Sequence, residues 1–182
     1  MIRLIEHLNE AIGWPSLLWL FPVLFMFHDF EEILTVEAWA VKHRDKVLPA
    51  MPPFARKALS ASFNCDTRQF AQDVLYVFTV IVASTVLAVF FSFYLPFLAA
   101  LSLFFIHSFT HAFQALYLKM YTPGVWSAVL IALPYSAYTF YRYLAANIVD
   151  WADIGQSLIL LAIAGPPLLW LLLKGRAKAA GQ

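Results

Sequence analysis

The sequence predicts an all-α fold: a polytopic membrane helix bundle of about five transmembrane helices with an N-terminal interfacial helix. Hydrophobic residues make up 62% of the 182 positions and charged residues 13%, whereas a soluble domain carries about 25% charged residues. Residues 74–118 contain no Asp, Glu, Lys or Arg and are too long for one crossing, since about 20 residues span the hydrocarbon. Internal repeats are absent. We expect a single membrane domain over residues 1–182.

The N-terminal segment, residues 1–13, places apolar side chains near one helical face and polar ones elsewhere, as a helix lying in the membrane interface does. No cleavage site of a secretory signal follows it. The first span is predicted over residues 14–41. Pro15 suits the start of a helix, and Pro22 is expected to kink it.

Residues 42–67 form the one long polar connection, and residues 54–63 within it can form an amphipathic surface helix. The second and third spans, about 68–93 and 96–120, follow on either side of the corner at Tyr94-Leu95-Pro96. These boundaries rest on the length of the uncharged stretch and on the proline.

A tight turn at Thr122-Pro123-Gly124 precedes the fourth span, about 125–147. The fifth span, about 154–173, contains Gly165-Pro166-Pro167, where we expect a break.

Basic residues near the span ends predict the orientation. Three lie in the tail, and six lie in the connection after the first span or directly at its end: Lys42, Arg44, Lys46, Arg56, Lys57 and Arg68. The N-terminus is therefore expected outside and the C-terminus in the cytoplasm, which requires an odd number of spans.

The stretch His28-Asp29-Phe30-Glu31-Glu32 puts four ionisable residues inside the first span. Such groups are costly at membrane depth, so they must face a protein interior or a wet cavity. His28 shares a helical side with Glu31 at i+3 and with Glu32 at i+4. These three are the first half of a predicted site.

The third span carries the second half, His107 and His111, which lie one turn apart, with Gln114 one turn further on. At ~1.5 Å per residue, His28 lies about 21 Å from Trp14, and the two histidines lie about 17 and 23 Å from Pro96. The two predicted clusters therefore lie at similar depth.

Asp73 and Gln69 in the second span and Glu37 in the first span lie nearer the predicted cytoplasmic end. We expect these three residues and Gln114 either to hold the ligand side chains in place or to line the mouth of a cavity that leads to the site. Asp73 is also a possible sixth metal ligand.

Imidazole and carboxylate are the ligands that zinc, iron and manganese accept. His28, Glu31, Glu32, His107 and His111 can hold one divalent ion, zinc or iron, or just supply a two-ion site. A carboxylate left over, Glu31 or Glu32, can act as the catalytic base. Two other interpretations stay open: a proton relay or transport site, and a structural network of interhelical hydrogen bonds.

The His28–Glu32 motif, the later histidine pair and the segment Tyr121-Thr122-Pro123-Gly124 resemble the HXXEE-domain family of bacterial integral membrane proteins, whose function is largely uncharacterised. The resemblance extends from about the first to the fourth span. It implies a membrane fold, a bacterial inner-membrane location and His28, Glu31 and Glu32 as motif positions. It implies no particular reaction.

We therefore expect a metal-dependent membrane enzyme that acts on a lipid or another hydrophobic small molecule, by hydrolysis at zinc or oxidation at iron. A proton- or metal-ion-coupled transporter and a structural, partner-binding membrane subunit are the alternatives. The net charge of +1 argues against a nucleic-acid partner, which would call for a basic patch.

Overall fold

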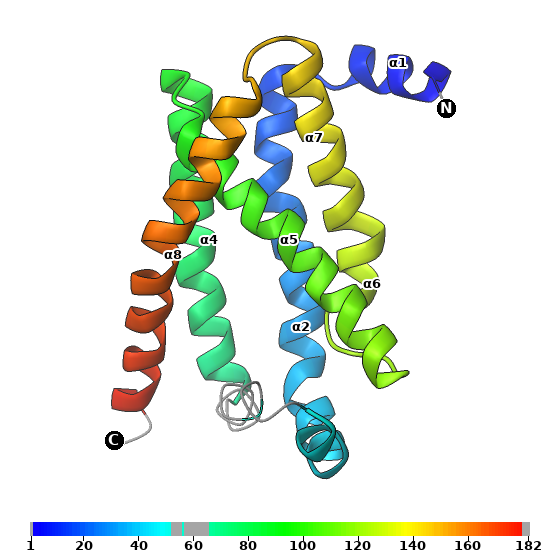
Figure 1. The fold of residues 1–182 in the computed structure, drawn as a ribbon, viewed down its shortest axis with the longest axis vertical. Helices are drawn as coiled ribbons and strands as arrows, with labels where there is room; N and C mark the ends of the chain where they lie inside the picture. Colours follow the sequence, from blue (N-terminus) through cyan, green and yellow to red (C-terminus); the bar gives the residue numbers. More distant parts are fainter. Residues whose placement is uncertain (1, 52–55, 57–65, 180–182) are drawn as a thin grey trace.

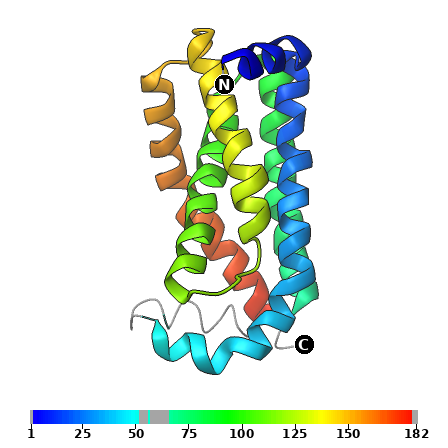
Figure 2. The same cartoon turned by 90° about the vertical axis from the view of Figure 1, so that its right-hand side faces the viewer.

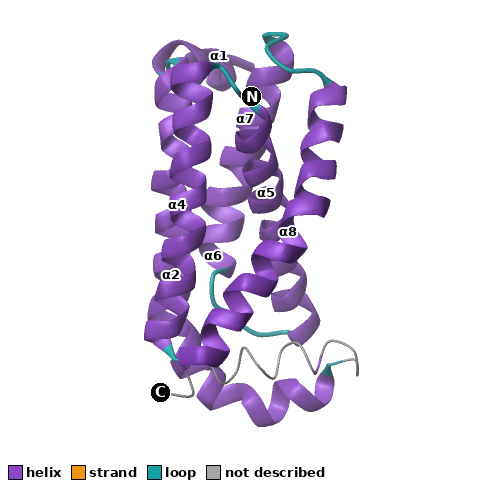
Figure 3. Cartoon of the chain, turned by 90° about the vertical axis from the view of Figure 1, so that its left-hand side faces the viewer, coloured by secondary structure: helices purple, strands orange, loops and turns teal. Residues whose placement is uncertain are grey.

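The computed structural model describes residues 2–51, 56 and 66–179, and every regular element among them is helical (Figures 1 and 3). The predicted all-α class is confirmed for this part of the chain. The elements in chain order are α1 (Ile2–Ala11), α2 (Trp14–Ala50), α4 (Thr67–Phe91), α5 (Leu95–Leu118), α6 (Val125–Ser127), the π-helical η1 (Ala128–Ala132), α7 (Leu133–Ala145) and α8 (Trp151–Ala179).

Two of the described helices, α4 and α5, are long and apolar enough to cross a membrane. A third crossing results if α1 and α2, which are bent by 99° relative to each other, count as one broken span. This number is smaller than the five crossings predicted from the sequence. The surface agrees with membrane character, since large apolar side chains such as Phe90, Phe91 and Leu116 are exposed.

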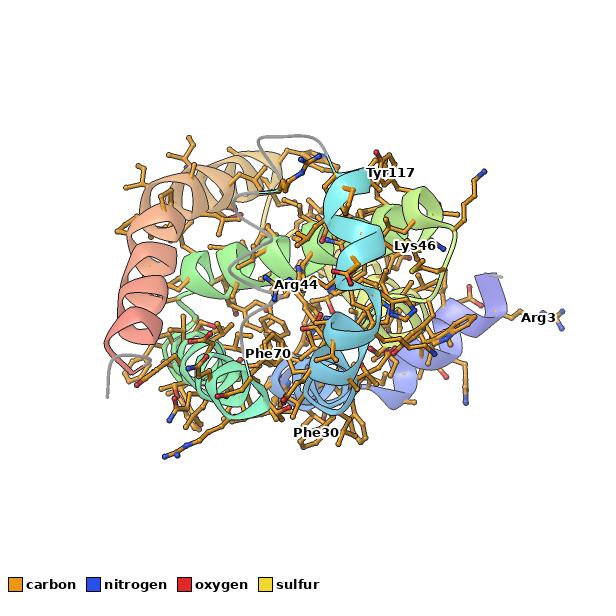
Figure 4. The ribbon with its side chains drawn as sticks, turned by 90° about the horizontal axis from the view of Figure 1, so that it is seen from below. Arg3, Phe30, Arg44, Lys46, Phe70 and Tyr117 are labelled. Atoms are coloured by element: carbon orange, nitrogen blue, oxygen red, sulfur yellow. The ribbon has the colours of Figure 1, made fainter. Side chains whose placement is uncertain are left out.

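The first helix, α1, projects sideways from the end of the bundle (Figure 1). Seen from below, its Arg3 points away from the bundle, as does Phe30 of α2 (Figure 4). The next helix, α2, continues to Ala50 and passes through Pro22 and Pro49. It is therefore longer than the predicted span over residues 14–41. The surface helix expected over residues 54–63 lies outside the described residues, apart from Arg56.

The corner between α4 and α5 is built from Ser92, which adopts a left-handed conformation with φ 53°, and from Pro96 in the first turn of α5. Proline is tolerated there because the first helical N–H groups have no partner within the helix. The corner sends α5 obliquely back across the bundle (Figure 1).

The predicted fourth span is not a regular α-helix, because α6, η1 and α7 follow one another without a break. Pro134 lies just after the π-helical turn. Its ring clashes with the carbonyl one turn earlier and it donates no hydrogen bond, which favours a locally widened helix. The final helix, α8, runs through Pro166 and Pro167, so the break expected there does not end it.

The core lies where α2, α5 and α7 meet. Phe21 is fully buried, and its ring centroid lies 5.4 Å from that of Phe97 and 6.2 Å from that of Tyr135. The Tyr135 hydroxyl donates to the Leu17 carbonyl at 2.9 Å. Helix α4 packs along α2, and α8 packs on α5 (Figures 1 and 2). These contacts fix the register between α2 and α5.

Candidate metal centre

Four side chains from two helices converge below this core. His28 and Glu32 come from α2, and His107 and His111 come from α5. One possible ligand atom from each residue lies within 4.8 Å of the corresponding atoms of the other three. Each pair is spaced i, i+4, so it occupies one face of its helix, and the packing of α5 against α2 turns the two faces toward each other.

The distances within this His/Glu group are short. Nε2 of His111 lies 2.8 Å from Nε2 of His107 and 3.1 Å from Oε1 of Glu32. The ring centroid of His28 lies 4.9 Å from that of His111 and 5.5 Å from that of His107. Three imidazoles and a carboxylate therefore surround one point.

A hydrogen-bonded chain fixes the tautomer of His28. The Ser127 hydroxyl lies 2.5 Å from Oε2 of Glu31 and 3.0 Å from Nδ1 of His28. The single hydroxyl proton goes to the carboxylate, the stronger acceptor, so the Ser127 oxygen accepts from Nδ1–H of His28. Its Nε2 then keeps a free lone pair. That nitrogen is buried and has no hydrogen-bond partner among the described residues.

Glu31 is directed away from the His/Glu group, toward the start of α6. Its carboxylate accepts from the backbone N–H of Ser127 at 2.8 Å, from that of Trp126 at 3.4 Å and from the Tyr121 hydroxyl at 2.8 Å. A carboxylate at the first turn of a helix satisfies N–H groups that have no partner within the helix. Partial desolvation raises the pKa of the Tyr121 phenol, so this hydroxyl keeps the proton that it donates.

Gly124 closes the other side of the group. Its φ is +80°, and a Cβ added to it would lie 2.8 Å from both Oε1 of Glu32 and Cε1 of His111. Such a contact is impossible without displacement of the two side chains. Only glycine combines this backbone conformation with this close approach.

Two members of the group are buried, whereas Glu32 is half-buried and His107 on α5 is the most exposed of the four. His28 is 1% exposed and His111 is 5% exposed, and the Glu32 side chain is 12% exposed. Asp29 is buried beside them, and its Oδ2 has no hydrogen-bond partner among the described residues. Buried polar groups are costly unless they find partners.

The four residues expected to support the ligands or to line the cavity mouth lie outside the His/Glu group. Glu37 accepts from both the backbone N–H and the hydroxyl of Thr67, which ties α2 to the start of α4. Gln69 and Asp73 lie in the first turns of α4, and Gln114 lies one turn beyond His111 on α5. An open hollow of about 480 Å³ adjoins Glu37 and Thr67, but Gln69 and Asp73 do not line it.

The donor set fits a divalent metal ion. Zinc binds imidazole nitrogen and carboxylate oxygen at about 2.0–2.2 Å, which in a tetrahedron separates neighbouring ligand atoms by roughly 3.4 Å. The separations of 2.8 and 3.1 Å around Nε2 of His111 are shorter than this value, and no separation within the group exceeds 4.8 Å. An ion would also supply the missing partner of Nε2 of His28, and unpaired buried atoms of this kind mark ion or water sites.

A known family model extends over the residues of the His/Glu group. Residues 19–139 match the family model described as a protein of unknown function with HXXEE motif. The chain belongs to the HXXEE family. No curated protein and no solved structure matches it. The matched residues include the whole His/Glu group, together with Tyr121, Gly124 and Ser127.

The side chains of the three named HXXEE residues make different contacts in the structure. His28 and Glu32 face the histidines of α5. Glu31 instead accepts a hydrogen bond from the Ser127 hydroxyl, whose oxygen accepts one from Nδ1 of His28. The intervening residues differ from each other too, since Asp29 is buried and Phe30 is exposed.

Sequence reasoning did not identify Ser127 as part of the site or assign Tyr121 and Gly124 a place in it. The segment from Tyr121 to Gly124 was available as a signal, because it contains a turn glycine and is part of the likeness to the HXXEE family. Nothing in the spacing of Ser127 pointed to a partner 99 positions earlier.

Proposed function

We propose that this HXXEE protein is a metal-dependent membrane enzyme that holds one divalent ion, zinc or iron, with His28, Glu32, His107 and His111. The supporting observation is the convergence of their ligand atoms within 4.8 Å, with His28 and His111 buried. Neutral imidazole and carboxylate are suitable ligands for both metals.

One ion is favoured over two. A two-ion centre needs further carboxylates, and the oxygens of Glu31 are already engaged by Ser127, Tyr121 and Trp126. We therefore assign Glu31 a positioning role rather than a place among the ligands.

A bound ion of this kind supplies Lewis acidity and lowers the pKa of water. The protein's own contribution is the orientation of three imidazoles and the transfer of a proton. Besides these four ligands, a catalytic ion would need one open position for water. Oε1 of Glu32 faces His111, which would leave Oε2 of the same carboxylate to accept a proton from that water. Glu32 is thus our candidate for both ligand and general base.

The proposed substrate is a lipid or another hydrophobic small molecule. The His/Glu group lies within helices whose outer surface is strongly apolar, with Phe27, Phe109 and Phe113 exposed near the ligand-bearing positions. A substrate dissolved in the bilayer can approach such a surface directly. Hydrolysis at zinc and oxidation at iron are the two reaction classes that the donor set supports.

The proposed location is the bacterial inner membrane, with five crossings, the N-terminus outside and the C-terminus in the cytoplasm. The support is the excess of basic residues after the first span and in the tail. Because Cys65 is the only cysteine, one substitution gives a cysteine-free background for labelling. Cysteines introduced at Gly13 and at the exposed Ala152 should react with an impermeant reagent from outside, and one at Lys42 only after lysis; the opposite pattern refutes the orientation.

Metal analysis of the purified protein tests the enzyme proposal most directly. We expect about one zinc or iron per chain, and loss of that metal in His111→Ala. The control is His43→Ala, because His43 bonds to the Trp39 carbonyl of its own helix and lies outside the group. Wild-type protein that holds no transition metal after growth with metals refutes the proposal.

The alternative roles predict different results. A metal with a purely structural role would leave stability dependent on the ion, with no turnover of lipid substrates. A transporter would move a metal ion or protons across liposomes in a manner that depends on Glu32.

A further inference from the structure

A second polar site lies at the opposite end of the bundle, around Arg142 of α7. Arg142 and the His/Glu group are at different ends of the same fold, since about ten helical residues, or roughly 15 Å at 1.5 Å per residue, separate Arg142 from the π-helical turn that follows Ser127. The family match ends at residue 139, so this site is independent of the HXXEE motif and of the function proposed above.

Arg142 is buried, at 9% exposure, and no carboxylate among the described residues forms an ion pair with it. One guanidinium nitrogen donates to the Ile12 carbonyl at 2.8 Å and to the Tyr138 hydroxyl at 3.3 Å. The guanidinium carbon lies 4.5 Å from the centroid of the Trp14 ring. These neutral groups orient the guanidinium, but its charge has no counter-ion, and an uncompensated buried charge is costly.

An open hollow of about 230 Å³ adjoins this guanidinium; its lining residues are Asn9, Trp14, Tyr141, Arg142, Ala145 and Ala146. Its volume is several times the ~30 Å³ that one water occupies. The two alanines leave the space open, while the guanidinium supplies positive charge at its wall.

A second donor faces the same hollow. Because Arg142 donates to the Tyr138 oxygen, Tyr138 uses its own proton to donate to Oδ1 of Asn9 at 3.0 Å. The amide NH₂ of Asn9 is therefore left as a donor. Two kinds of donor, one of them charged, and no acidic residue in the lining together describe a site for an oxyanion.

We propose that this hollow binds the phosphate of a membrane phospholipid. A lipid is favoured over a soluble anion by the surroundings: α1 is amphipathic and lies crosswise at this end of the bundle, and Trp14 and Tyr141 line the hollow. Tryptophan and tyrosine gather at the depth of lipid headgroups. Arginine pairs with phosphate through its planar fork of donors.

Native mass spectrometry in detergent tests the proposal with phosphatidylglycerol as the probe. Wild-type protein should retain one lipid, and Arg142→Gln should bind it at least about tenfold more weakly, as expected when one charge-assisted pair is lost. The matched control is Arg3→Gln, because Arg3 is exposed and points away from the bundle (Figure 4). Equal lipid retention by wild type and Arg142→Gln overturns the proposal.

Two further arms cover the other outcomes. Inorganic phosphate that displaces the lipid at similar concentration would mark a site for soluble anions and overturn the lipid assignment. If Arg142→Gln does not fold, Ala146→Leu tests the lipid site instead. The leucine side chain fills the hollow and leaves the contacts of Arg142 with Ile12 and Tyr138 intact. This variant should also lose the lipid, and normal retention by it refutes the proposal.

Discussion

Nδ1 of His28 lies 3.0 Å from the hydroxyl of Ser127, although 99 positions separate the two residues. The same hydroxyl meets Glu31, three residues after His28, at 2.5 Å. The Glu31 carboxylate is therefore linked to the His28 imidazole by two hydrogen bonds through Ser127. We call this the relay; its first and last residues, Glu31 and His28, both belong to the HXXEE motif. Such outer contacts fix ring orientation and tautomer at metal sites.

Removing the Ser127 hydroxyl should weaken metal binding without removing a ligand. We expect Ser127→Ala to lower the affinity for zinc about 10- to 100-fold, the usual effect of losing an outer-shell partner, while about one ion still binds at saturation. Competition with a chromogenic chelator measures the affinity. Ser136→Ala is the control, because Ser136 is buried on α7 but its hydroxyl has no partner among the described residues. Equal affinities in the two variants would contradict the relay.

The two motif carboxylates should respond differently to neutralisation. Glu32→Gln removes a ligand and should cost more affinity than the ~10–100-fold typical of outer-shell changes. Glu31→Gln should stay within that range, because Glu31 reaches the group only through Ser127. Calorimetric titration with zinc compares them. The assignment fails if Glu31→Gln loses the ion and Glu32→Gln keeps it.

A methyl group at position 124 should disrupt the site. Gly124→Ala forces alanine into a left-handed conformation, which costs about 1–2 kcal/mol, and places Cβ 2.8 Å from Glu32 and His111. We expect reduced stability together with loss of stoichiometric metal. Gly155→Ala is the control, since nothing lies within 4 Å of its added Cβ and alanine favours a helix. Wild-type metal content in Gly124→Ala would show that the close approach is dispensable.

Metal should stabilise the folded protein measurably. Free ion at 100 times its dissociation constant adds about 2.7 kcal/mol if it binds only the folded state, so a chelator should lower the unfolding temperature by several degrees. Differential scanning fluorimetry in detergent provides the measurement. His111→Ala should unfold at the same temperature with and without chelator. A chelator effect of equal size in this variant would place the ion elsewhere.

The sequence predicted the all-helical class, and four of its five candidate ligands lie together in the structure. His28, Glu32, His107 and His111 stood out because ionisable side chains at i, i+4 spacing interrupt long apolar runs, and the depth comparison matched the two pairs. The sequence did not predict that Glu32 faces the histidines while Glu31 binds Ser127. Both fall on the same broad helical side as His28, and local spacing does not distinguish a side chain facing α5 from one facing α6.

Sequence alone determined the helical periodicity, the apolar surface and the five candidate ligands that interrupt it, because these follow from local composition and the 3.6-residue repeat. The tertiary structure decided which partners each residue meets. Ser127 reaches His28, and Gly124 reaches Glu32, only because the turn after α5 brings the start of α6 back against α2. Contacts between residues distant in sequence depend on how the helices pack, and no local pattern along the chain records that packing.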